Sequence, residues 1–262
     1  MQSNIDSREY VHLLGDEMER RDIHMSIGKL ICIAHAGGSA SSYLRWSRYF
    51  DANMKVVPLE YAGRGVRSSE KLYNNMNEAV ADLVDELKPH LADGIPYALF
   101  GHSLGALAAY ELACELQKSH LLMPTILVVS GRNPPHMRST KKRHELPEAE
   151  FREELITMGG TPSELLQDKS FAEYFIPIAR SDFKLAETYQ LQSARPKLHT
   201  NVGILNGMAD EWVDLEHADK WGDYCEGIVW NEQFPGGHFY LHESPEQVAL
   251  FLNRRLAQQP VW

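Results

Sequence analysis

The segment 101–105 (GHSLG) has the spacing G-x-S-x-G, which presents a serine hydroxyl as a nucleophile when it lies in a sharp turn from a strand to a helix. The apolar run 97–100 precedes it directly, and a stretch rich in helix formers follows from Ala106. A turn this tight strains its central residue, and a Cβ at either flanking position would collide with the neighbouring backbone. The alternative is an ordinary turn with a capping serine. We predict that Ser103 is a nucleophile.

A serine hydroxyl is a weak nucleophile at neutral pH, so a base must take its proton and a third group must orient that base. In chains with this kind of turn the order is serine, then an acid, then histidine. An apolar run at 201–206 leads into Asp210, and a later run leads through a glycine pair into His238. We therefore predict that His238 is the general base and that Asp210 orients it.

Other residues compete for both roles. Asp214 lies in the same loop as Asp210, and His242 follows His238 closely. Taken alone, His238 can be interpreted as a turn histidine that bonds to the backbone, and Asp210 can be interpreted as the N-cap of a helix near 214–223. Only their joint occurrence in the required order favours catalysis.

Acyl transfer also needs donors aimed at the developing oxyanion. One is the backbone N–H of Leu104, at the start of the helix after the nucleophile. We assign the second to Ala36, because it lies in a loop with consecutive glycines, 35–39 (HAGGS), after the first predicted strand. This loop lacks the spacing and the lysine of a phosphate-binding P-loop.

Short apolar runs alternate with helical periodicity along most of the chain, which is typical of a mostly parallel sheet covered by helices on both faces. The clearest helices are predicted at 75–91, 104–117 and 245–257. Strands are predicted at 28–34, 54–59, 96–101, 124–130, 201–206 and 227–232. The fold class is therefore α/β, and the catalytic pattern favours the α/β-hydrolase fold.

The alternation is interrupted between Gly131 and Lys197, where helical patterns occur without a good strand. We interpret residues 132–196 as a helical lid inserted into one domain at 27–262. Residues 1–26 form an N-terminal extension, with one short helix expected around 10–14 and no function assigned.

The composition limits the classes of partner. The 262 residues carry a formal net charge of −10, which argues against sequence-independent nucleic-acid binding and disfavours anionic membranes. The three cysteines (Cys32, Cys114 and Cys225) are far apart and form no CxxC pair, so neither a disulfide framework nor a zinc site is indicated. No secretory or membrane-spanning segment is evident. We expect a cytoplasmic protein.

Several collinear segments together resemble the type II thioesterases, the free-standing editing enzymes of nonribosomal peptide and polyketide assembly lines. The resemblance runs from about Leu30 to Leu256, and one departure from the usual pattern is Ala34, where the family usually has proline. The matching segments are 34–40, Trp46, 59–65, 101–106, 130–132, 182–183 with Tyr189, and 234–239.

The resemblance implies hydrolysis of aberrant or stalled acyl groups from the phosphopantetheine arm of an acyl or peptidyl carrier protein. It implies no cofactor and no metal, and we expect a monomer. The family's lid corresponds to the insertion at 132–196. The apolar positions of this lid either wall an acyl chamber or only pack the lid onto the domain, and they are Phe151, Leu155, Ile156, Leu165, Leu166, Phe171, Phe175 and Ile178.

Other functions stay open at this stage. Within enzymes, the alternatives are a product-releasing thioesterase for medium-chain acyl groups and a small-molecule esterase. From a different class, the chain could be an inactive hydrolase fold used for binding. A cluster of cations enters the lid without an intervening carboxylate, and it either docks an acidic carrier or is a solvated loop. Its members are Arg132, Arg138, Lys141, Lys142 and Arg143.

Overall fold

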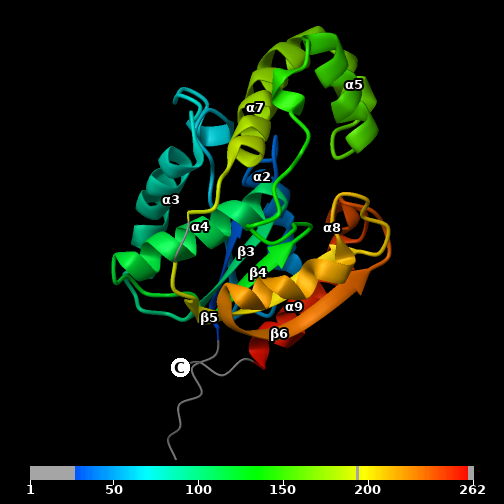
Figure 1. The fold of residues 1–262 in the computed structure, drawn as a ribbon. Helices are drawn as coiled ribbons and strands as arrows, with labels where there is room; N and C mark the ends of the chain where they lie inside the picture. The colour runs from blue at the N-terminus through cyan, green and yellow to red at the C-terminus, as the bar shows by residue number, and fades with distance from the viewer. Residues whose placement is uncertain (1–26, 193–194, 259–262) are drawn as a thin grey trace, which may run out of the picture.

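The computed structural model describes residues 27–192 and 195–258, and within these ranges six parallel strands form one sheet (Figure 1). The N-terminal extension, with the helix expected around 10–14, lies outside the described residues. The sheet order is β2-β1-β3-β4-β5-β6. Each predicted strand is present, with small shifts at its ends: β1 (Lys29–Ile33), β2 (Lys55–Pro58), β3 (Tyr97–His102), β4 (Ile126–Ser130), β5 (Leu198–Gly207) and β6 (Cys225–Phe234).

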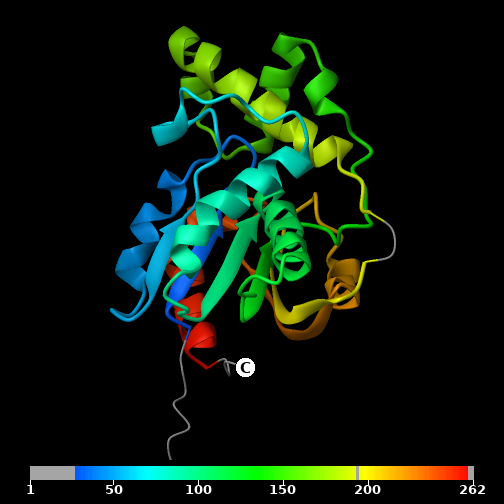
Figure 2. The ribbon, with the colours of Figure 1, turned by 90° about the vertical axis from the view of Figure 1, so that its left-hand side faces the viewer.

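Helices cover both faces of this sheet. Helices α3 (Met76–Leu91) and α4 (Leu104–Lys118) lie on one face and α9 (Pro245–Ala257) on the other (Figure 2). The side chain of Asn75 caps α3 by accepting a hydrogen bond from the backbone N–H of Glu78. The shorter elements are α2 (Ser41–Leu44), α8 (Tyr240–Glu243) and the 3₁₀ segments η1 (Arg45–Tyr49), η2 (Gly65–Arg67), η3 (Arg143–Glu145) and η4 (Leu215–Asp223).

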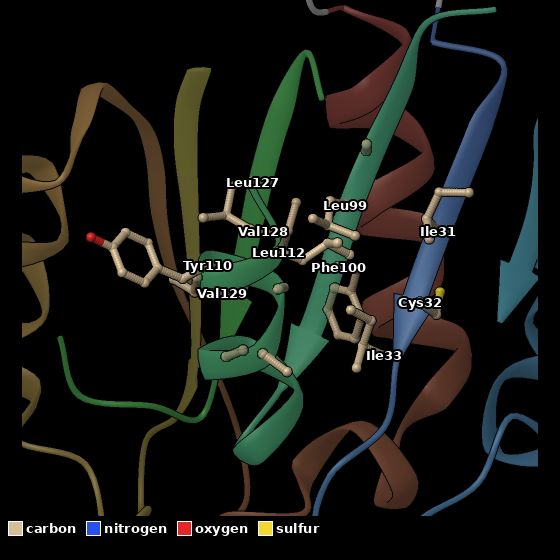
Figure 3. Close-up of a cluster of buried hydrophobic side chains, with 14 of the residues drawn as sticks. Ile31, Cys32, Ile33, Leu99, Phe100, Tyr110, Leu112, Leu127, Val128 and Val129 are labelled. Atoms are coloured by element: carbon tan, nitrogen blue, oxygen red, sulfur yellow. The ribbon is translucent and has the colours of Figure 1, made fainter. Parts of the chain in front are cut away.

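The core lies on both faces of the central strands, against α4 on one face and α9 on the other. Every residue of β1, β3 and β4 is buried, as expected for parallel strands covered on both faces. Figure 3 shows Leu99 and Phe100 of β3 among the side chains of β1, β4 and α4. This packing fixes the carboxyl ends of the strands at one edge of the sheet.

The chain between β4 and β5 forms a helical segment at that edge, made of α5 (Glu148–Met158), α6 (Ser163–Gln167) and α7 (Lys169–Thr188) (Figure 1). No described residue between Ser130 and Leu198 lies in a strand, as the sequence predicted. The segment has its own apolar cluster, which includes Phe151, Leu155 and Leu166. Residues 132–196 are called the lid segment below.

Two further features bear on the environment of the chain. Within the described ranges, no helix is long and apolar enough to cross a membrane. The three cysteines are free, and burial raises the pKa of the Cys32 and Cys225 thiols, the latter to about 12.

Candidate active site

Ser103 occupies a strained turn between β3 and α4. Its φ of 55° and ψ of −113° lie outside the regions that non-glycine residues usually adopt. Its N–H donates to the Ser130 carbonyl at 2.8 Å, which continues the hydrogen bonding of β3 with β4. The side chain therefore stands at the carboxyl edge of the sheet, as the G-x-S-x-G pattern predicted.

The two glycines of this turn permit close backbone contact. A Cβ on Gly101 would lie 2.0 Å from the carbonyl oxygen of Gly105, and a Cβ on Gly105 would lie 2.2 Å from that of Ile33. Real Cβ atoms do not approach so closely, so any side chain here would displace the backbone. The glycines hold Ser103 tightly against β1 and the start of α4.

His238 and Asp210 meet in a buried contact at the same edge of the sheet. The Nδ1 atom of His238 lies 2.8 Å from Oδ2 of Asp210, and both side chains are almost fully buried. The other carboxylate oxygen of Asp210 accepts a hydrogen bond from the N–H of Trp212 at 2.9 Å. The Ala209 N–H donates to the Gly236 carbonyl, which joins the two loops. This arrangement fixes the imidazole ring and leaves its Nε2 available for proton transfer.

The competing residues are engaged elsewhere. Asp214 caps η4 by accepting from the N–H of Glu216, and its other oxygen lies 2.9 Å from Nδ1 of His217. Its side chain is 41% exposed. His242, in α8, stacks on Phe239. The N-cap role that the sequence offered as an alternative for Asp210 thus belongs to Asp214.

An aromatic shell surrounds His238, and sequence reasoning did not predict it. The ring of Trp212 packs against His238 with centroids 4.2 Å apart, and His102 lies against it at 4.9 Å. His102 is anchored through Nδ1 to the Ser130 hydroxyl, which in turn contacts the hydroxyl of Tyr240. The only signal in the sequence was the position of His102 beside the nucleophile. These contacts restrict the motion of the imidazole.

Two histidines near the site are neutral at physiological pH. Burial, reinforced by the neighbouring histidines, lowers the pKa of His35 to about 3. Burial likewise holds the pKa of His102 well below its usual value, with His238 as the next cause. Neutral rings next to His238 add no fixed positive charge to its surroundings.

A cavity of about 330 Å³ opens onto Ser103 and His238. Ala36 and Leu104, the residues predicted to supply oxyanion donors, line it as well. Among the described residues, neither backbone N–H donates a hydrogen bond to the protein. For Leu104 this follows from its place in the first turn of α4, where N–H groups have no partner within the helix. Both amides are therefore available to an oxygen of a bound molecule.

The lid residues that line this cavity are not the eight apolar positions considered in the sequence analysis. None of the eight apolar positions named above lines it. Phe151, Leu155, Leu166 and Phe175 pack in the lid's own cluster. The lid residues on the cavity wall include Met137, Met158, Phe183 and Ala186. Of the two alternatives for those eight positions, packing of the lid is therefore the one seen for the four that lie in the lid's own cluster.

The basic cluster at the start of the lid is only partly a free surface. The Arg143 side chain is 12% exposed and its Nε donates to Glu154 at 2.7 Å. Arg132 is half-buried, and Lys142 pairs with Glu145. Arg138 and Lys141 are exposed and lie on the rim of the cavity. Lys142 is exposed as well but pairs at the surface with Glu145, so Arg138 and Lys141 are the two exposed cations of the cluster that line the cavity.

Comparison with known proteins adds evidence on ancestry. The profile described as "Thioesterase domain" matches residues 28–256. The chain is 31% identical to the gramicidin S biosynthesis protein GrsT of Aneurinibacillus migulanus, covering 87% of this chain and 88% of that protein. It is 34% identical to the thioesterase PikA5 of Streptomyces venezuelae (84% and 78%) and 32% to the medium-chain S-acyl fatty acid synthase thioesterase of Anas platyrhynchos (85% and 88%).

Solved structures are similar over nearly the whole fold. ClbQ from the colibactin NRPS/PKS pathway superposes with a TM-score of 0.83 at 34% identity, covering 88% of this chain and 97% of that one. The type II thioesterase BorB from the borrelidin biosynthetic cluster gives a TM-score of 0.75 at 32% identity, with 89% and 94% covered. The similarity therefore includes both the sheet and the lid segment.

Proposed function

The chain belongs to the thioesterase family, and on that premise we propose that it removes aberrant or stalled acyl groups from the phosphopantetheine arm of carrier proteins in a nonribosomal peptide or polyketide assembly line. The catalytic residues are Ser103, His238 and Asp210. The observation that supports these roles is the buried contact between His238 and Asp210 at the cavity that Ser103 lines.

The proposed reaction proceeds in two halves. His238 Nε2 takes the proton of Ser103 as its Oγ attacks the thioester carbonyl, and the N–H groups of Ala36 and Leu104 stabilise the oxyanion. Collapse of this intermediate breaks the carbon–sulfur bond, and the imidazolium returns its proton to the departing thiolate. A water molecule, deprotonated by His238, then attacks the acyl-serine and releases the carboxylic acid and the free hydroxyl of Ser103. Asp210 orients the imidazole and stabilises the imidazolium throughout.

Relatives support the carrier-bound substrate. ClbQ comes from the colibactin NRPS/PKS pathway, GrsT is a gramicidin S biosynthesis protein, and BorB is a type II thioesterase from the borrelidin biosynthetic cluster. The cavity lies next to the lid segment, which must shift to admit a phosphopantetheine arm. The free thiols fit a reducing cytoplasm, where we place the enzyme.

A second candidate is release of finished medium-chain acyl products, which the similarity to the duck fatty acid synthase thioesterase favours. The two functions share one mechanism and differ in substrate. The acyl groups that the enzyme prefers distinguish the two functions. An editing enzyme accepts short and varied acyl groups, whereas a product-releasing enzyme is selective for chain length.

The test compares one acyl group on a carrier protein, on coenzyme A and as an oxygen ester, together with a series of chain lengths on the carrier. We expect the highest kcat/KM with the carrier and a shallow dependence on chain length. The variant Ser103→Ala should lower kcat by at least about 10⁴-fold. Ser119→Ala, at the far end of α4, is the matched control and should retain activity. A fully active Ser103→Ala variant would refute the mechanism.

A further inference from the structure

A buried ion pair joins the lid segment to the loop that follows β2, and both of its side chains also contact the loop that follows β1. Arg64, in the loop after β2, and Asp182, in α7, are 2% and 1% exposed. The two guanidinium Nη atoms lie 2.5 Å and 2.7 Å from the two carboxylate oxygens, which makes the pair bidentate. Burial opposes the charge on Arg64, but Asp182 outweighs that effect and raises the guanidinium pKa above its usual value.

The same two side chains hold the backbone of the loop. Asp182 Oδ2 accepts a hydrogen bond from the N–H of Gly37 at 2.7 Å, and Arg64 Nη1 donates to the carbonyl of Gly38 at 3.0 Å. The loop itself is a tight turn, in which Gly38 N–H donates to the His35 carbonyl and Gly37 has a φ of +77°. The ion pair therefore fixes the Ala36–Gly37 peptide group, which adjoins the N–H of Ala36, and the Gly38–Ser39 peptide group.

Helix α7 also touches this turn through apolar contacts. A Cβ added to Gly37 would lie 2.8 Å from Cζ of Phe175 and 3.7 Å from Cβ of Ala179. Phe175, Ala179 and Asp182 recur at helical spacing, so a single face of α7 rests on the turn. The position of the turn thus depends on the position of a lid helix.

Stability alone does not account for the pair. The cost of removing two charges from water offsets much of their attraction, so apolar side chains of similar size often stabilise a core equally well. The Nε atom of Arg64 is also buried without a hydrogen-bond partner among the described residues. What the pair supplies beyond packing is a fixed orientation of the turn.

We propose that Arg64 and Asp182 are positioning residues that hold the N–H of Ala36 in place for the oxyanion and make its placement depend on the seating of α7. The inference rests on the proposed function. It implies that the enzyme is competent when the lid segment rests on the turn, and that movement of α7 away from the sheet disrupts the oxyanion site.

The test uses Asp182→Asn, which keeps the size of the side chain but cannot accept from Arg64 and Gly37 as a carboxylate does. We expect kcat on a small acyl thioester to fall by about 10- to 100-fold with KM nearly unchanged, because a displaced oxyanion donor costs somewhat less than a lost one. A purely electrostatic effect would act in the opposite direction, because removing a carboxylate near the turn favours a developing negative charge.

Two ketone inhibitors separate positioning from a general change in the pocket. A trifluoromethyl ketone forms a tetrahedral adduct with the serine and needs the oxyanion donors, whereas the methyl ketone of the same chain does not. Affinity for the first should fall in proportion to kcat, and affinity for the second should stay the same. Equal losses for both inhibitors, or wild-type kcat in a folded Asp182→Asn protein, would overturn the proposal.

Glu111→Gln is the matched control. Glu111 is also a buried carboxylate paired with an arginine, Arg195, but it lies on α4 away from the cavity. It should lower the melting temperature without changing kcat, and an equal loss of kcat would argue against a specific role for Asp182. If Asp182→Asn fails to fold, Arg64→Lys takes its place with the same measurements, because lysine keeps the charge but not the bidentate geometry. An active Ser103→Ala variant would instead refute the proposed function itself.

Discussion

At the scale of single residues, the choice between Asp210 and Asp214 is the sharpest test of the proposed triad. Asp210 is buried against His238, whereas Asp214 caps η4 and contacts His217. Asp210→Asn should lower kcat by about 10⁴-fold, because an amide facing Nδ1 favours the wrong imidazole tautomer. Asp214→Asn removes only a cap contact and should change kcat little. Steady-state kinetics on one acyl thioester checks this, and the reverse order would show that Asp214 is the acid.

Burial of His102 leads to a second prediction, which concerns the dependence of stability on pH. The pKa of His102 is well below its usual value in the folded chain, while in the unfolded chain a histidine takes up a proton below about pH 6.5. The unfolded state therefore binds the extra proton, and the free energy of unfolding falls as the pH decreases from 6.5. The contribution of His102 to this slope is about 1.4 kcal/mol per pH unit.

Replacing His102 by asparagine, which can keep the contact with Ser130, should remove that contribution. Urea unfolding at several pH values measures it, with the slope for the variant shallower than for the wild type between pH 6 and 4. Above about pH 7.5 the unfolded histidine is neutral too, so the two slopes should coincide there. Parallel slopes over the whole range would show that His102 is not held neutral in the folded protein.

The sequence predicted where three residues lie, because their positions follow from strand order along the chain, whereas their catalytic roles stay a prediction. Ser103, Asp210 and His238 each follow a strand whose carboxyl end lies at the edge where the cavity forms, so strand order places them together. Trp212 against His238 and Arg64 against Asp182 depend on contacts between distant loops and a lid helix. No local pattern specifies such contacts, although residues 59–65 and 182–183 belong to the segments that resemble the family.

At the scale of elements, the central strands β1, β3 and β4 were the most predictable, because parallel strands buried on both faces are nearly continuous apolar runs. The lid was predictable as helical but not in its packing. Its apolar residues pack against one another in a small separate cluster. Whether such a residue packs within the lid or lines the cavity depends on how the lid helices cross.

This small cluster leads to a prediction about dynamics. The lid cluster has seven buried residues, far fewer than the main core, so opening it exposes less apolar surface. Amides of α5 and α6 should exchange with solvent faster than those of β3 and β4. Hydrogen exchange followed by mass spectrometry measures this, and α7 should be slower than α5 because Asp182 anchors it. Uniform protection across the lid and the sheet would contradict the prediction.

At the scale of the whole molecule, charge limits how a carrier can approach. Carrier proteins are typically acidic, and this chain carries a net charge of −10, so the overall interaction is repulsive. Attraction must then come from a local basic surface. The exposed side chains of Arg138 and Lys141 stand at the rim of the cavity, where an arriving phosphopantetheine arm would enter.

If these two cations steer the carrier, reversing their charge should slow association. The double variant Arg138→Glu/Lys141→Glu should lower kcat/KM for an acyl carrier about tenfold at low ionic strength, and the difference should shrink as salt screens the interaction. The control reverses Lys88 and Lys118, which lie on α3 and α4 and pair with Asp85 and Glu115, so that net charge changes equally. A small acyl thioester should be hydrolysed at similar rates by all three proteins. Equal losses on carrier and small substrate would mean that the rim cations only shape the cavity, and no loss on either would mean that they are an ordinary solvated loop.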